Sequence, residues 1–462
     1  MVVYKFGGAL ARSRRGLLAL VKLLQEAQKR EAVRMRRADR SRSGKNSSAE
    51  INGVVLVVSA IGHTTRNLAR AAELAEDGKL REAEEVLDKS IVQHEQLAES
   101  LGLNDAGLFD RLTKLSRDIA SLLEGVAIVR ELSPRTRDAI LASGESLATI
   151  LIEALLKDHE IPVRLVEARN LIVTDENFGH AAPVLDETSR RVEKQIVPQL
   201  RRSYVVLTQG FVGSTRDSIT TTMGSESSDL TATLLASVLS AEEVVIWKTV
   251  PGLYTADPEL VKAPKLIRSL SFDEAEEMGR RGARILFPTF AHPIVQSNTK
   301  TLVRIATPFA RTTGHTTISR ELARPKQRSS GTGGLALAIE EHLVSMVVSA
   351  SNLHAFGKHN IILQWQSEAE IRIVIRKEDK KVFLRDLEAA GHTAKESATV
   401  SAISLILSRP DFVPEAFSLI AKSMHNFRVY AILQAGRSLI VLVDDAEGIP
   451  ALRKLHHDLF EN

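Results

Sequence analysis

The sequence predicts an α/β fold, in which a mostly parallel sheet is sandwiched by helices and is followed by two small α+β units. Beyond Gly144, strand and helix signals alternate, which is typical of a parallel sheet covered by helices. After residue 334 short apolar strand candidates dominate instead. The strands expected in the two regions are 162–166, 205–208 and 243–247, then 361–365, 371–375, 400–407, 429–433 and 439–443. A chain of 462 residues is long enough for two to four domains.

The first part of the chain supplies two further strands of the sheet. Residues 2–6 are expected to form a short buried strand, which a Gly-Gly turn separates from an amphipathic helix between about Gly16 and Lys29. Val54–Val58 is a run of five apolar residues and predicts a second buried strand. Residues 66–140 have helical periodicity and contain no strand candidate. They are therefore expected to form a helical excursion from the sheet.

Composition excludes several classes of protein. The sequence has no cysteine, which excludes disulfides, thiolate metal sites and cysteine nucleophiles. The N-terminal residues MVVYKFGG enter a strand without an apolar signal core, and no stretch reaches the ~20 apolar residues of a membrane span. Scattered histidines without ligand spacing predict no metal site. We therefore expect a soluble, cytoplasmic protein without a membrane partner.

A basic run between Lys29 and Lys45 is the one strongly charged segment of the sequence. Such a run could contact nucleic acid or acidic lipid. It has no aromatic or apolar partners, and aromatic residues make up only 4% of the chain, which disfavours base stacking. The run is therefore interpreted as a solvated insertion between a helix and the next strand, and no nucleic-acid partner is expected.

Three polar clusters follow predicted strands, at the sheet edge where ligands bind in α/β folds. Lys5-Phe6-Gly7-Gly8 could bring a positive charge and backbone amides to a phosphoryl group, although an ordinary tight turn has the same pattern. In residues 220–229 (TTTMGSESSD), hydroxyl groups could bind phosphate or carboxylate while Asp229 caps a helix or orients Lys5; a plain N-cap box is equally compatible. Residues 246–258 form a long loop with Pro-Gly and Asp-Pro turns.

These clusters, in this order, resemble the signatures of the aspartate kinases in the amino acid kinase superfamily. Residues 57–65, 143–145 and 282–288 resemble further motifs of that family, and the paired C-terminal units resemble ACT domains. The resemblance covers nearly the whole chain and implies four segments. These are a catalytic domain at 1–323, a linker at 324–334, a first ACT-like domain with a shortened helix at 335–396, and a second ACT-like domain at 397–462.

The resemblance also implies an activity and a set of site residues. The expected reaction is ATP-dependent phosphorylation of the L-aspartate β-carboxylate to 4-phospho-L-aspartate, the first step of lysine, threonine and methionine biosynthesis, with ATP and Mg²⁺ as cofactors. Lys5 and Asp229 correspond to catalytic positions, and no side chain corresponds to a metal ligand. The aspartate-binding positions are Thr65, Glu145 and Ser228. The ATP-binding positions are Lys5, Gly7, Gly8, Lys248, Thr249, Tyr254 and Arg284.

Some residues depart from the family pattern and leave alternatives open. The Gly-Arg-Gly-Gly-Ser-Asp loop of the family reads GSESSD at residues 224–229, so the arginine that would bind the substrate carboxylate is missing. Lys248-Thr249 replaces a Thr-Asp pair. One alternative is a weak or inactive homologue that senses amino acids through its ACT-like units, and another is a kinase for a different carboxylate or phosphate substrate. An amino-acid effector and a homodimer or higher homo-oligomer are expected in addition.

Overall fold

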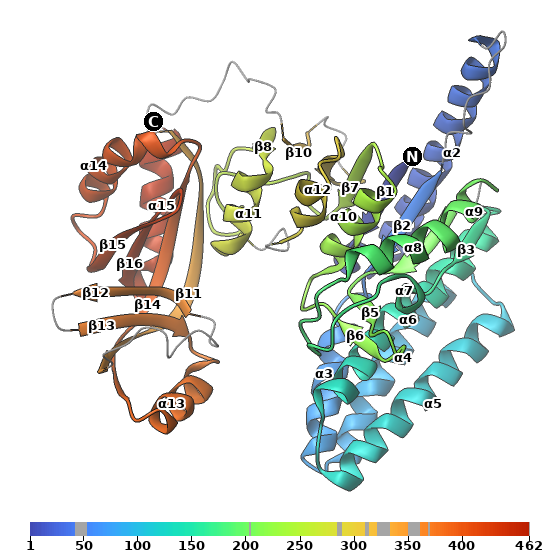
Figure 1. Cartoon of the computed structure of the whole chain (residues 1–462), viewed down its shortest axis with the longest axis horizontal. Coiled ribbons are helices and arrows are strands. Elements are labelled where there is room, and N and C mark those ends of the chain that lie inside the picture. Colours follow the sequence, from blue (N-terminus) through green and yellow to red (C-terminus); the bar gives the residue numbers. More distant parts are fainter. Residues whose placement is uncertain are drawn as a thin grey trace. The chain divides into compact units, whose positions relative to one another are not determined.

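The protein folds into two compact units, which we describe separately (Figure 1). In this computed structural model the described residues are 1–41, 53–202, 205–283, 289–309, 314–320, 333–349, 361–367 and 370–461. The first unit consists of Met1–Leu253, Arg268–Phe272 and Thr289–Leu322. The second unit consists of Tyr254–Ile267, Asp273–Pro288 and Ala323–Asn462.

An eight-stranded sheet organises the first unit, in the order β3-β4-β2-β1-β7-β9-β10-β8. All neighbouring strands are parallel except β9 and β10, which are antiparallel. The predicted α/β fold with a mostly parallel sheet is therefore confirmed. The strands are β1 (Val2–Phe6), β2 (Val54–Val58), β3 (Val163–Leu165), β4 (Val205–Gln209), β7 (Glu243–Trp247), β8 (Ser269–Ser271), β9 (Leu302–Ala306) and β10 (Thr316–Ser319).

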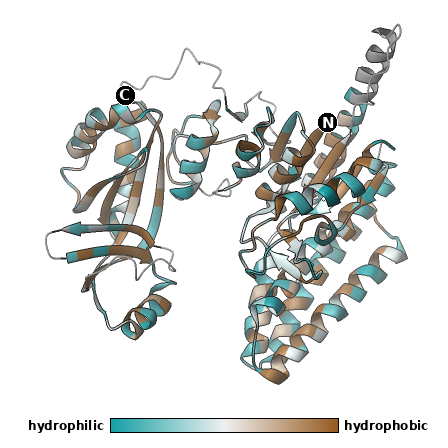
Figure 2. Ribbon diagram, viewed as in Figure 1, coloured by the Kyte–Doolittle hydropathy of each residue, from teal (hydrophilic) through white to brown (hydrophobic). Residues whose placement is uncertain are grey.

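Alternation along the central strands decides which side chains can form a site. Tyr4 and Phe6 of β1 point into the large core that also holds Leu56 and Leu207. Because successive strand residues point to opposite faces, Lys5 lies on the other face. Helix α10 (Ser228–Val238) packs on that face against β1, β2 and β7. Figure 2 shows how hydrophobic residues concentrate in these strands, which makes a buried lysine exceptional among them.

Four long helices form the predicted excursion from the sheet. They are α3 (Thr64–Glu76), α4 (Leu80–Leu101), α5 (Ala106–Val129) and α6 (Pro134–Asp158). Local signals set their ends: the Ser133 side chain accepts a hydrogen bond from Thr136 N at the start of α6, and Gly102 takes a left-handed conformation after α4. By length and composition α6 could cross a membrane, but 72% of its apolar window is buried, as in a core helix.

The remaining elements of the first unit are short, with one exception. Helix α2 runs from Arg14 to Ser41, so the predicted end at Lys29 is wrong and the first part of the basic run is helical. Residues 42–45 of that run lie outside the described residues, and its interpretation as a solvated insertion stays a prediction. The short elements are α1 (Gly8–Ala11), α7 (Ala168–Leu171), α8 (Leu185–Gln195), α9 (Val197–Leu200), α12 (His292–Gln296) and the hairpin of β5 (Val212–Ser214) and β6 (Thr220–Thr222).

The second unit is built on an antiparallel six-stranded sheet, in the order β12-β13-β11-β14-β16-β15. The predicted α+β character of this region is confirmed. Its strands are β11 (Gly334–Ser349), β12 (Ile361–Ser367), β13 (Glu370–Arg376), β14 (Thr393–Leu407), β15 (Val429–Ala435) and β16 (Ser438–Asp444). Its helices are α13 (Lys380–Ala389), α14 (Val413–Ser423), α15 (Gly448–His456) and most of α11 (Phe272–Arg280).

Two cores share the long strands β11 and β14. The second half of β11 packs with β13 and with Phe383 and Leu387 of α13. The first half contributes Leu337 to a core that contains residues of β14, β16, α14 and α15. The predicted boundary at residues 396 and 397 remains a prediction, but Leu337 and Ile339, which precede it, pack in one core with residues that follow it. The predicted shortened helix between Val348 and Ile361 falls outside the described residues.

A pair of glycine substitutions would test the packing at the start of α2. A Cβ atom on Gly16 would lie 1.8 Å from the Leu10 carbonyl oxygen, which is backbone and cannot easily move. We expect Gly16→Ala to lower the stability of the protein by about 1–3 kcal/mol, the usual cost of overpacking. Thermal unfolding followed by circular dichroism would measure the change.

Gly125 in α5 provides the matched control. It is exposed, and a Cβ atom there would meet nothing within 4 Å. Gly125→Ala should therefore raise stability by up to about 1 kcal/mol, because alanine is the better helix former. Equal shifts of the melting temperature in the two variants would contradict the packing described at Gly16.

Candidate active site

A buried carboxylate holds two lysines together at the end of the central strands. Lys5 Nζ of β1 lies 2.9 Å from Asp229 Oδ1, and Lys248 Nζ, which follows β7, lies 3.2 Å from Asp229 Oδ2. Lys5 is only 5% exposed and Asp229 only 1%. The structure thus brings together two residues more than two hundred positions apart, and it adds Lys248 to them.

The charges of this cluster are strongly coupled. Burial lowers the pKa of Lys5, while the adjacent Asp229 opposes that shift. Burial alone would raise the pKa of Asp229, but Lys248 and Lys5 together hold that pKa below its ordinary value. Asp229 also lies in the first turn of α10, where the helix dipole favours a negative charge. Two ammonium groups share one carboxylate, so the cluster has an excess of positive charge that suits an anionic ligand.

The Gly-Gly turn after β1 brings two backbone segments into close contact. Gly62 N–H donates to the Gly8 carbonyl at 3.1 Å, and a Cβ atom on Gly8 would lie 2.0 Å from the Ala60 carbonyl oxygen. A side chain at Gly8 is therefore excluded. Gly7 N–H donates to the Trp247 carbonyl at 3.3 Å. Because Gly8 opens helix α1, its own amide has no acceptor within that helix.

Glu145 of α6 is a second buried acid close to the same turn. Its Oε1 accepts a hydrogen bond from Ala60 N at 3.0 Å, whereas its Oε2 is buried without a hydrogen-bond partner among the described residues. Burial raises the pKa of Glu145 to about 8, although the Ala60 amide and the charge of Lys5 oppose the shift. An orphaned carboxylate oxygen in such a place is costly unless a ligand supplies a donor. Glu145 is thus suited to bind an ammonium group.

The other predicted aspartate-binding residues begin helices. Ser228 opens α10, is 3% exposed, and packs so closely on Gly210 that a Cβ atom there would lie 2.4 Å from the Ser228 Cβ. Thr65 lies in the first turn of α3 and is half-buried. Their proposed contacts to substrate stay predictions.

The loop before α10 differs from the simplest interpretation of its sequence. Ser227 occupies the N-cap position but its side chain makes no capping hydrogen bond, so the N-cap box is wrong. Asp229 instead pairs with Lys5, as the other interpretation expected. Gly224 and Glu226 both have positive φ, 93° and 66°. The glutamate therefore stands in a conformation that favours glycine.

The threonines of the same cluster have a structural role. Thr222 N and Oγ1 donate to the carboxylate of the buried Asp138 at 2.8 and 2.7 Å, and Gly179 N donates to it at 2.9 Å. Thr221 Oγ1 lies 2.7 Å from Thr174 Oγ1. Thr222 thus holds the β5–β6 hairpin to α6, and Thr221 holds it to Thr174 in the segment after α7, so neither hydroxyl group is available to a phosphate. The corresponding sequence hypothesis is corrected for these two residues.

One residue of the site was missed in the sequence. Thr208 on β4 is fully buried, and its Oγ1 has no hydrogen-bond partner among the described residues. Thr208 pairs with Val57, and Val57 pairs with Lys5, so both polar side chains lie on the α10 face of the sheet. The available signal was a hydroxyl group at the end of an otherwise apolar strand.

The predicted nucleotide-binding residues lie in different parts of the protein, and one of them is not described by the structure. Lys248 belongs to the charged cluster, and the exposed Thr249 follows it with its carbonyl oxygen 3.3 Å from Thr307 Oγ1. Tyr254 belongs to the second unit, where it forms an isolated bridge with Leu266. Arg284 lies outside the described residues.

Known proteins resemble this chain in sequence and in structure. It is 29% identical over 370 residues to lysine-sensitive aspartokinase 3 of Escherichia coli, with 75% of this chain and 82% of the relative covered. The crystal structure of E. coli aspartokinase III with aspartate and ADP superposes with a TM-score of 0.82 over 100% of both chains, at 24% identity. The same enzyme with lysine and aspartate gives a TM-score of 0.72 at 25% identity, covering 100% of this chain and 99% of the other.

The match at family level concerns the part of the chain that carries the buried lysines and acids. Residues 1–304 match the Amino acid kinase family, which is more than half of the chain and includes Lys5, Glu145, Asp229 and Lys248. The chain belongs to the amino acid kinase family.

Proposed function

We propose that the protein is an aspartate kinase, which transfers the γ-phosphoryl group of ATP to the β-carboxylate of L-aspartate and makes 4-phospho-L-aspartate. This product would enter lysine, threonine and methionine biosynthesis. The observation that carries the proposal is the buried Lys5–Asp229–Lys248 cluster with an orphaned Glu145 oxygen near it. The E. coli relative is named an aspartokinase, and its structure was determined with aspartate and ADP.

The charged cluster accounts for the phosphoryl transfer. A substrate carboxylate is ionised at neutral pH and is already a nucleophile, so no general base is required. One of its oxygens attacks the γ-phosphorus while the bond to the β-phosphate oxygen breaks and ADP leaves. Lys5 stabilises the negative charge on the transferring group. Asp229 keeps the ammonium groups of Lys5 and Lys248 in position during the reaction.

Glu145 accounts for the recognition of an amino acid. Its free Oε2 accepts a hydrogen bond from the α-ammonium group of aspartate, which supplies the donor that this oxygen lacks and forms a charge pair with it. Thr65 and Ser228 donate hydroxyl groups to the substrate carboxylates. The family arginine that would share this task is absent, since Ser225 stands at its position. The hydroxyl of Thr208 is a further candidate contact on the same face.

Mg²⁺ is expected to enter with the nucleotide. Among the residues that the structure describes, no three His, Asp or Glu side chains are arranged to hold a metal ion. Mg²⁺ commonly binds through substrate phosphates and one or two carboxylates, and it neutralises phosphate charge when bound. Gly7, the Gly8 amide, Lys248 and Thr249 are the proposed ATP contacts of the first unit, and Tyr254 and Arg284 stay ATP-binding residues predicted from the sequence.

The second unit is proposed to bind an amino-acid effector, and the enzyme to act in the cytoplasm as a homodimer or higher homo-oligomer. Strands β12 and β15 are the edges of the six-stranded sheet, and unpaired edges favour association. Light scattering during size-exclusion chromatography would test association, and a monomer at micromolar concentration would contradict it. The alternative of an inactive sensor is not favoured, because Lys5 and the buried acids Glu145 and Asp229 are retained.

The first test of the proposal is a substrate comparison. ADP release is measured with aspartate, with glutamate and without an amino acid, and aspartate should give the highest rate. Lys5→Ala should lower turnover by on the order of 10²–10³-fold, because it removes a preorganised charge at the transferring group. Lys22→Ala, at an exposed position of α2, is the control and should keep the wild-type rate. Equal ADP release under all three conditions would refute an aspartate kinase.

A second test uses the raised pKa of Glu145. Only the carboxylate form pairs well with an ammonium group, so the KM for aspartate should fall as pH rises toward about 8 and should then level off. Glu145→Gln should raise the KM by on the order of 10–100-fold, as expected for loss of a charge-assisted hydrogen bond, and should abolish this pH dependence. Glu124→Gln at an exposed position of α5 is the control.

The raised pKa of Glu145 also predicts how the stability of the protein without substrate depends on pH. A carboxyl whose pKa is raised in the folded state stabilises the fold at low pH and loses that contribution as pH rises from about 4.5 to about 8. Glu145→Gln should therefore show a smaller decrease of melting temperature over this range than wild type. Parallel pH profiles of the two proteins would contradict the burial described for Glu145.

A further inference from the structure

The loop before α10 does not by itself account for the recognition of the whole substrate. L-Aspartate has an α-carboxylate in addition to the β-carboxylate that is phosphorylated. Residues 224–229 contain no cationic side chain, and the exposed Glu226 adds a negative charge to them. Because like charges repel, this loop disfavours a second carboxylate unless another element supplies a donor or a positive charge.

Helix α10 begins with donors that no other part of the described chain uses. The backbone amides of Ser228 and Asp229 have no acceptor among the described residues. Ser227 precedes them and is fully buried, and its Oγ has no hydrogen-bond partner there either. Lys5 and Lys248 balance the charge of Asp229 in the same turn. A helix N-terminus favours an anion, and a buried hydroxyl without a partner is an independent sign of a missing ligand.

The ring of His180 lies against the first residue of this loop. A Cβ atom on Gly224 would be 3.2 Å from His180 Nδ1, so the ring packs on the Gly224 backbone. The Gly224 carbonyl accepts a hydrogen bond from Ser227 N at 3.2 Å, which links the ring to the turn that carries the buried hydroxyl. His180 is exposed, and its ring nitrogens have no partner among the described residues. An imidazole N–H can donate to a carboxylate, and a protonated ring adds a positive charge.

Backbone hydrogen bonds on both sides of His180 hold it beside the loop. Gly179 N donates to the carboxylate of the buried Asp138 at 2.9 Å, and Ala181 N donates to the Thr222 carbonyl at 2.9 Å. Thr222 Oγ1 donates to the same carboxylate at 2.7 Å. The segment between α7 and α8 is thus attached to strand β6 two residues before the loop begins, and the ring cannot move far from the start of α10.

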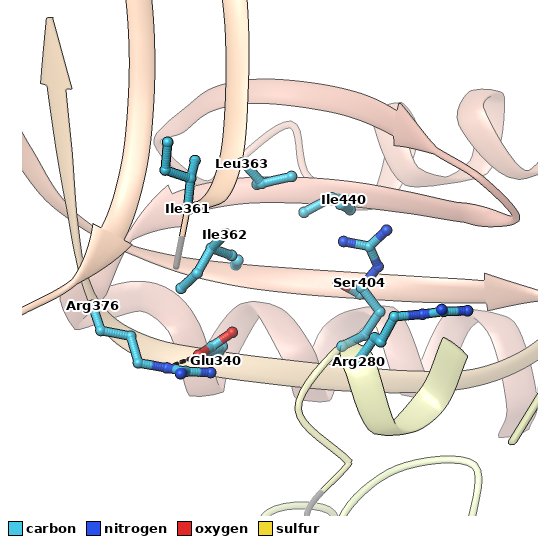
Figure 3. A pocket seen from close by; sticks show the side chains of 10 residues that line it. Arg280, Glu340, Ile361, Ile362, Leu363, Arg376, Ser404 and Ile440 are labelled. Carbon is cyan, nitrogen blue, oxygen red and sulfur yellow. Dashed lines mark hydrogen bonds and ion pairs between the residues drawn. The ribbon is translucent and has the colours of Figure 1, made fainter. Parts of the chain in front are cut away.

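The arginines that surround a cavity in the second unit already have acidic partners (Figure 3). Arg376 Nε donates to Glu340 Oε1 at 2.7 Å, and Figure 3 shows the two side chains next to each other. Arg280 and Arg281 both pair with Glu277, at 3.4 and 2.8 Å. These guanidinium groups are engaged where they are, in contrast to the histidine ring beside the loop.

We propose that His180 binds the α-carboxylate of aspartate and is a specificity-determining residue of the proposed kinase. A ring N–H donates to one carboxylate oxygen, and the Ser227 hydroxyl with the first amides of α10 donates to the other. The inference rests on the proposed function, because it names the residues that recognise the part of the substrate that is not phosphorylated. A histidine from a separate segment thus performs the task of the arginine that Ser225 replaces.

The test compares aspartate with its α-amide, which keeps the ammonium group and the β-carboxylate but lacks the second negative charge. ADP release by the full-length protein gives kcat/KM for both. His180→Ala should lower kcat/KM for aspartate by on the order of 10-fold, as for one lost charge-assisted hydrogen bond, and should leave kcat/KM for the α-amide and the KM for ATP unchanged. Adding Ser225→Arg should raise kcat/KM for aspartate again, because a guanidinium group binds a carboxylate.

His159→Gln is the matched control, since this half-buried histidine follows the end of α6, and it should keep wild-type kinetics. Unchanged kcat/KM for aspartate in His180→Ala would overturn the inference, and so would equal losses for both substrates that Ser225→Arg does not correct. A wild-type protein that releases no ADP with aspartate would instead refute the proposed kinase. Calorimetry of aspartate binding then tests His180 alone, and equal affinity in wild type and His180→Ala would overturn its role.

Discussion

The buried carboxylate of Asp229 is the constraint on which the first unit depends. It is attached to a helix, and the two ammonium groups that it binds come from a central strand and from the segment after its neighbour. Removing a charge from water costs several kcal/mol per ion, and only close pairing offsets that cost. Helix α10 must therefore be placed with its first turn over β1, and the contact between Gly210 and Ser228 keeps it there. Folding therefore also positions the ammonium groups of the proposed phosphoryl-transfer site.

The two buried acids Asp229 and Glu145 differ in the number of partners that balance their charge. Asp229 has more cationic partners than it can neutralise, whereas Glu145 has one oxygen without any partner in the part of the chain that the structure describes. Under the proposed function, the phosphates of ATP compensate the excess positive charge around Asp229, and the ammonium group of aspartate supplies the missing partner of Glu145. Substrate selection in this interpretation follows from charges that the fold keeps out of water.

The sequence predicted the central strands well because their signal is local. Val54–Val58 and Glu243–Trp247 were expected with the bounds that the structure has, since each is an apolar run between polar residues. The meeting of Lys5 with Asp229 was also expected, because both correspond to catalytic positions in the aspartate kinases that the sequence resembles. In contrast, the role of Asp138 could not be inferred, since its partner Thr222 is 84 positions away and belongs to a hairpin that has only three residues in each strand.

The long strands of the second unit were underestimated for a different reason. The first half of β14 is mostly exposed and polar, so only residues 400–407 have the appearance of a buried strand. Partners in β11 hold that polar half in the sheet, and this tertiary pairing overrides its weak strand propensity. The end of α2 was misjudged similarly, because its last residues lack an apolar stripe.

The sharing of β11 and β14 has a consequence for how this part of the molecule could be divided. A protease cut or a gene fusion between residues 396 and 397 would sever β14, and each fragment would keep a hydrophobic face whose covering strand had gone with the other fragment. Neither fragment is then a module that can be transplanted alone. The two halves of the six-stranded sheet therefore form one structural unit, which evolution would gain or lose as a whole.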